Sequence, residues 1–70
     1  MISHEILEAE ARVDRTAADL IEAQDKGFEL LTSPPVRADD AQQIKLTIAQ
    51  AQRQFQEALE NLKSAYRKAD

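Results

Sequence analysis

Thr32-Ser33-Pro34-Pro35 is the stretch that divides this 70-residue chain. Two consecutive prolines cannot both lie inside a helix, and the residue before each proline is disfavoured in helical geometry. About 30 residues without proline flank the stretch on each side. The stretch therefore predicts a single helical hairpin over residues 1–70, with one helix at about 3–31, a proline-containing turn at 32–38 and a second helix at about 39–69.

The first half has the apolar periodicity of a packed helix. Apolar or small residues recur at alternating steps of three and four, the spacing that puts them on one side of a helix. We call these positions the seam of the first helix: Ile2, Ile6, Ala9, Val13, Thr16, Leu20, Ala23, Gly27 and Leu30. Ser3 is the expected N-cap. Gly27 leaves an alternative open, because glycine often follows the last residue of a helix; since the seam continues beyond it, we expect a continuous helix.

The second half repeats the pattern over its whole length. Its seam consists of Ala41, Ile44, Ile48, Ala51, Phe55, Ala58, Leu62, Ala65 and Ala69. Asp39 and Gln42 resemble a capping box at the start of this helix. Both seams alternate large and small residues, so large side chains of one helix can pack over small ones of the other.

Equal helix lengths and a short connection predict an all-α, antiparallel, coiled-coil-like hairpin. The charges agree with this pairing. Residues 1–31 hold eight acids and three bases, a net charge of −5, and residues 32–70 hold five acids and six bases, a net charge of +1. An acidic helix beside a nearly neutral one avoids like-charge repulsion.

Composition excludes several classes of protein. The chain has no cysteine and a single histidine, His4, so disulfides, thiolate metal sites and sites with several histidines are excluded. Its net charge of −4 makes nucleic acid an unfavourable partner. No apolar run is long enough to span a membrane, and residues 1–5 lack the basic start of a signal peptide, which predicts a cytoplasmic location.

Apolar residues beside the seams predict a surface for a protein partner. The apolar arc of the first helix is wider than one neighbouring helix can cover, and two residues widen the edge of the second seam. We call this set the predicted interface: Leu7, Asp14, Ala17, Ile21, Phe28, Leu31, Leu59 and Tyr66. Three interpretations remain open: these residues thicken the hairpin's own contact, pair two hairpins as a homodimeric four-helix bundle, or bind a helix of another protein.

No combination of residues predicts catalysis, a cofactor or a metal. His4 and Glu8 are one helical turn apart, but no third ligand accompanies them. Paired carboxylates need a pocket that raises the pKa of one of them, which two helices do not build. The basic cluster of Arg53, Lys63, Arg67 and Lys68 suits the negative end of a helix dipole. We therefore expect a protein that is not an enzyme.

The outline of about 70 residues, with a helix, a proline-containing turn and a helix, resembles small hairpins of bacterial type III secretion. Those hairpins include needle subunits and needle co-chaperones. The charged end Tyr66-Arg67-Lys68-Ala69-Asp70 departs from the apolar C-terminus of needle subunits. Three functions follow as expectations: a small adaptor or co-chaperone, a structural subunit or needle co-chaperone of a secretion-type assembly, or a small dimeric regulator that binds nucleic acid.

Overall fold

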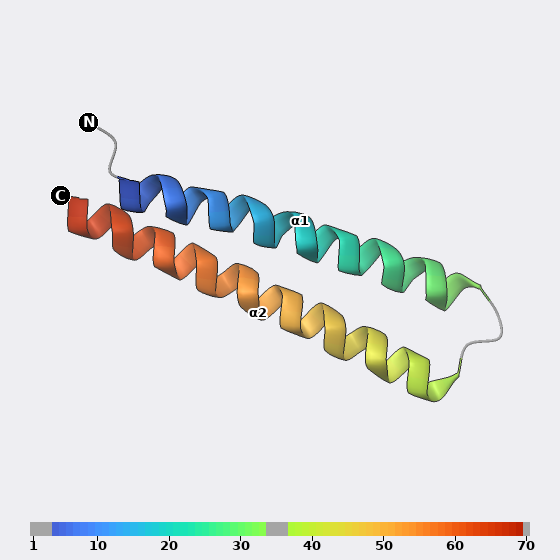
Figure 1. The fold of residues 1–70 in the computed structure, drawn as a ribbon. Coiled ribbons are helices and arrows are strands. Elements are labelled where there is room, and N and C mark those ends of the chain that lie inside the picture. The colour runs from blue at the N-terminus through green and yellow to red at the C-terminus, as the bar shows by residue number, and fades with distance from the viewer. Residues whose placement is uncertain (1–3, 34–36, 70) are drawn as a thin grey trace.

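The computed structural model describes residues 4–33 and 37–69, which form two helices packed side by side. Helix α1 spans His4–Thr32 and helix α2 spans Ala38–Ala69. The helices run in opposite directions, so the start of α1 and the end of α2 lie at the same end of the rod (Figure 1). The rod measures 54 × 14 × 10 Å between Cα atoms. The predicted all-α antiparallel hairpin is confirmed.

The helix ends differ slightly from the prediction. Helix α2 begins at Ala38, and Asp39 lies in its first turn, so the capping box predicted from Asp39 is wrong. The amide of Ala41 donates to the carbonyl of Arg37 at 3.0 Å, which extends the helical pattern toward the turn. At the end of α1 the hydroxyl of Thr32 donates to the carbonyl of Phe28 at 2.9 Å, so the side chain folds back on the last turn of the helix. The predicted N-cap Ser3, and Pro34 and Pro35, lie outside the described residues.

The seams form the contact between the helices. Every buried residue of the described chain is a seam residue, and they are Ile6, Ala9, Thr16 and Gly27 of α1 and Ile44, Ala58 and Ala65 of α2. Ile6, Ala9 and Ala65 cluster together, with Leu62 packed against them. The hydroxyl of Thr16 donates to the carbonyl of Arg12 at 2.8 Å, so its polar atom is satisfied inside the contact. Large and small residues interdigitate as their alternation predicts.

Helix α1 continues through Gly27, and the packing explains the glycine. A Cβ atom at this position would lie 2.7 Å from Cγ2 of Ile44 and 3.2 Å from Cδ1 of Ile48. Any side chain here would push the helices apart or displace an isoleucine. Gly27 therefore lets the two backbones approach closely, at a helix-propensity cost of about 1 kcal/mol.

Leu30 is the exception among the seam residues with described side chains. It remains 58% exposed, so its assignment to the seam is wrong in the structure. An open groove of about 210 Å³ lies beside it, lined partly by Ala23, Gly27 and Ile44. The small residues on α1 leave this space unfilled, and the Leu30 side chain remains largely in solvent. Within the described residues, neither helix is apolar over a length that would cross a bilayer.

Candidate protein-interaction site

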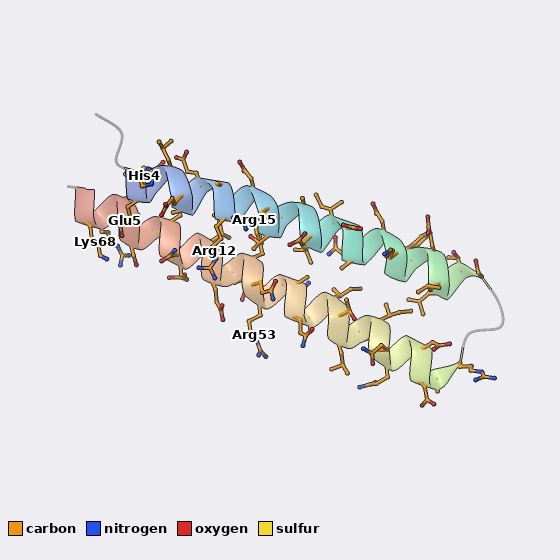
Figure 2. All side chains as sticks on the ribbon, viewed as in Figure 1. His4, Glu5, Arg12, Arg15, Arg53 and Lys68 are labelled. Atoms are coloured by element: carbon orange, nitrogen blue, oxygen red, sulfur yellow. The ribbon has the colours of Figure 1, made fainter. Side chains whose placement is uncertain are left out.

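Two contacts between the helices define the two flanks of the hairpin. The phenol of Tyr66 donates a hydrogen bond to Oε1 of Glu10 at 2.6 Å. On the opposite flank Nζ of Lys68 lies 3.5 Å from Oε1 of Glu5, and Figure 2 shows these two residues at the end where the chain begins and ends. Glu5 and Glu10 differ by five residues, which turns the side chain by about 140° around the helix. The two contacts therefore lie on different sides of the seams.

The flank that holds Tyr66 and Glu10 carries most of the exposed apolar side chains. Steps of three and four from Glu10 trace one stripe along α1: Leu7, Glu10, Asp14, Ala17, Ile21, Gln24, Phe28 and Leu31. The same steps from Tyr66 trace a stripe along α2: Tyr66, Lys63, Leu59, Gln56, Gln52, Ala49, Lys45 and Gln42. We call the two stripes together the apolar flank. All eight residues of the predicted interface belong to it.

These side chains are open to solvent although the helices are packed. The exposed fractions are 49% for Leu7, 59% for Ile21, 70% for Phe28, 48% for Leu31, 36% for Leu59 and 49% for Tyr66. Asp14 is exposed and Ala17 is half-buried. Leu7, Ile21 and Phe28 therefore add little to the contact between the two helices, which argues against the interpretation that they thicken it.

The stripes of the opposite flank are polar, and the groove beside the exposed Leu30 opens on this side between Lys26, Gln43 and Thr47. Its α1 stripe consists of Glu5, Glu8, Arg12, Arg15, Asp19, Glu22, Lys26 and Glu29. Its α2 stripe consists of Asp40, Gln43, Thr47, Gln50, Gln54, Glu57, Asn61, Ser64 and Lys68. Neither stripe contains an apolar residue. The hairpin therefore has one flank suited to burial and one suited to water.

Charge on the apolar flank is divided between the helices. The α1 stripe carries two acids, Glu10 and Asp14, and no base, whereas the α2 stripe carries two bases, Lys45 and Lys63, and no acid. The Glu10 carboxylate accepts the phenol proton of Tyr66, and this bond together with the negative charge of Glu10 raises the pKa of Tyr66 above 10.0. The phenol therefore stays protonated at neutral pH and links the two helices at this end of the flank.

Sequence reasoning grouped Leu59 and Tyr66 with Leu7 and Ile21 in one predicted interface but did not place them on one flank of the hairpin. It also missed Ala49, Lys45 and Lys63 as members of that surface. The sequence contains a signal for this placement. In an antiparallel pair, the residue that directly follows every other seam residue of one helix faces the equivalent residue of the other helix. Glu10 follows Ala9 and Tyr66 follows Ala65 in this way.

The other combinations of charged residues form local pairs. Nε2 of His4 lies 3.0 Å from Oε1 of Glu8 at an exposed end. Among the described residues, no group of three or more acidic or histidine side chains is placed to hold a metal ion. In the basic cluster Lys63 lies 3.9 Å from Glu60, and Arg53 points away from α1 on the outer side of α2 (Figure 2). Arg12, Arg53 and Glu57 line a broad depression there, which is open to solvent.

No family model, no curated protein and no solved structure matches the chain. Any statement about function therefore depends on the physical character of the two flanks.

Proposed function

We propose that this chain is a non-enzymatic protein-interaction module that works as a homodimer, in which the apolar flanks of two hairpins pair as a four-helix bundle. The observation that carries the proposal is the collection of six large exposed side chains on one flank, whereas the side of the polar flank has only Leu30 among the described residues. Contiguous exposed apolar surface of this kind marks a site of protein association. Burying one such side chain fully contributes about 1.5–3 kcal/mol.

The size of the surface supports the same proposal. The chain exposes 5736 Å², whereas a compact monomer of its 7.9 kDa mass exposes about 4,400 Å². A single layer of two helices leaves both faces of that layer in water, and this accounts for the difference. A domain of this size needs either a staple or a partner, and the sequence contains no cysteine for a disulfide.

The function of such a dimer would be that of a small adaptor or co-chaperone in the cytoplasm. An apolar helix of another protein can take the place of the second hairpin, since it offers the same kind of surface. A structural role in a secretion-type assembly would use the same flank. We favour self-pairing because six large exposed side chains gather on one flank, so two copies can bury them against each other in a closed, two-fold contact.

The test is Ile21→Asp, compared with Leu46→Asp as a matched control. Ile21 lies in the middle of the apolar flank, whereas Leu46 is 52% exposed on the outer side of α2 and belongs to neither flank. In the Ile21 variant, each of the two copies loses about 1.5 kcal/mol or more of the stabilisation that burial of this side chain gives the dimer. The dimer dissociation constant should therefore rise roughly 100-fold. Sedimentation equilibrium measures this constant, and circular dichroism checks that helicity is retained.

Leu46→Asp should leave the dissociation constant unchanged. A parent chain that is monomeric up to millimolar concentration, with its helices intact, would contradict the homodimer. Equal weakening by both substitutions would show that association is non-specific.

A further inference from the structure

We propose that the second copy lies on the apolar flank with the two-fold axis parallel to the long axis of the hairpin, so that α1 of each copy packs on α2 of the other. This inference rests on the homodimer proposed above and adds its geometry. Two hairpins can pair through this flank in a second way, with the two-fold axis across the rod, which puts α1 on α1 and α2 on α2 in opposite directions. The charges on the flank distinguish the two arrangements.

The positions along the rod follow from the contacts between the helices. Tyr66 and Glu10 are hydrogen-bonded, so they mark one level. Lys63 lies three residues further along the rod from Tyr66, and Asp14 lies four residues further from Glu10, so both are about one turn away at a common level. Near the turn, Gly27 lies against both Ile44 and Ile48, which puts Phe28 level with Lys45.

Packing α1 on α2 of the second copy brings opposite charges together. Lys63 of the second copy then lies over Glu10 and Asp14, the two acids of the α1 stripe. Because the axis is two-fold, the same pairing occurs twice in the dimer. Charge pairs of this kind set the register and orientation of an interface. Asp14, which interrupts the apolar stripe of α1, acquires a partner in this arrangement.

The flat face of the rod, 54 × 14 Å, corresponds to about 760 Å² in projection. A stable interface buries about 800 Å² on each partner, so the area is of the required size.

The alternative arrangement is unfavourable for the same residues. With the axis across the middle of the rod, Asp14 lies over Ile21 of the second copy, which buries a carboxylate against an apolar side chain and is costly without a partner. Lys63 then faces α2 of the second copy and meets neither Glu10 nor Asp14, so the pairing of opposite charges is lost. The cost would be incurred twice in a symmetric dimer.

Cross-linking of single-cysteine variants tests the geometry, since the natural chain has no cysteine to interfere. Asp14→Cys and Lys63→Cys chains are mixed, refolded together from denaturant and treated with a short bis-maleimide. The expected product is a cross-linked dimer in the mixture and little in either variant alone. Cysteine at Ser64 on the polar flank, mixed with Asp14→Cys, is the matched control and should give no product.

Each other outcome overturns a defined part of the proposal. A dimer by sedimentation in which Asp14→Cys chains cross-link to each other, or in which the mixture gives no product, overturns the axis but leaves the homodimer in place. Monomers of the parent chain at every concentration overturn the homodimer and the axis together.

Discussion

The hydrogen bond from Tyr66 to Glu10 joins residues that are 56 positions apart in the chain. It lies on the exposed surface, so its effect on the free energy of unfolding is modest. Its importance is geometric, because it identifies which side of α1 faces which side of α2. It also raises the pKa of Tyr66, which can be measured at that single residue.

The chain has one tyrosine and no tryptophan, so ultraviolet absorbance follows the titration of Tyr66 alone. We expect its pKa in the folded chain to lie above 10.0, because the phenolate cannot donate to Glu10 and is repelled by it. The stability from this contact is therefore complete below about pH 10, the pKa of an unfolded tyrosine, and is lost as pH rises through the folded pKa. Glu10→Ala should return the midpoint toward 10.

Glu8→Ala is the matched control for this titration. Glu8 lies on the same helix but contacts His4 and not Tyr66. A Tyr66 midpoint that is the same in the parent chain and in Glu10→Ala would show that the hydrogen bond does not persist in solution.

At the scale of the helices, the close approach at Gly27 determines how the two seams meet. Gly27→Ala gains about 1 kcal/mol of helix propensity. It also adds a Cβ 2.7 Å from Cγ2 of Ile44, and overpacking of this kind costs about 1–3 kcal/mol. We therefore expect a net loss of roughly 1 kcal/mol in the free energy of unfolding, measured by urea denaturation followed by circular dichroism.

Ile44→Leu provides the comparison, because leucine has no methyl group at the position of Cγ2. In that background Gly27→Ala should be neutral or stabilising, so the two substitutions should be coupled. If Gly27→Ala stabilised the parent chain as much as the Ile44→Leu chain, the close approach would not be the reason for the glycine.

The sequence predicted the elements well, because their signals are local. Proline positions and steps of three and four depend only on neighbours along one chain, and they identified both helices and every buried residue of the described chain. The errors lie near the turn, where Leu30 is exposed and α2 begins before Asp39. Helix ends depend on a few competing hydrogen bonds, and burial beside a turn depends on what the other helix supplies there.

At the scale of the whole molecule, the hairpin is a thin rod with two different flanks. If the apolar flanks of two copies pair, unfolding is coupled to dissociation, and stability depends on protein concentration. A 100-fold increase in concentration should then raise the melting temperature by roughly 5–10 °C. Differential scanning calorimetry over that range of concentrations measures the change.

Ile21→Asp should remove most of this dependence on concentration, whereas Leu46→Asp should retain it. A melting temperature that does not vary with concentration in the parent chain would show that the hairpin is stable without a second copy.

The sequence alone determined that the chain forms two long helices, which residues face each other between them, and that α1 carries more apolar surface than its partner helix can cover. These properties follow from spacing within each helix. Only the tertiary structure decided that Leu59, Tyr66, Ala49, Lys45 and Lys63 share a flank with that surface. The physical reason is that the relative rotation and register of two helices depend on contacts between residues far apart in the chain, such as Tyr66 with Glu10 and Gly27 with Ile44.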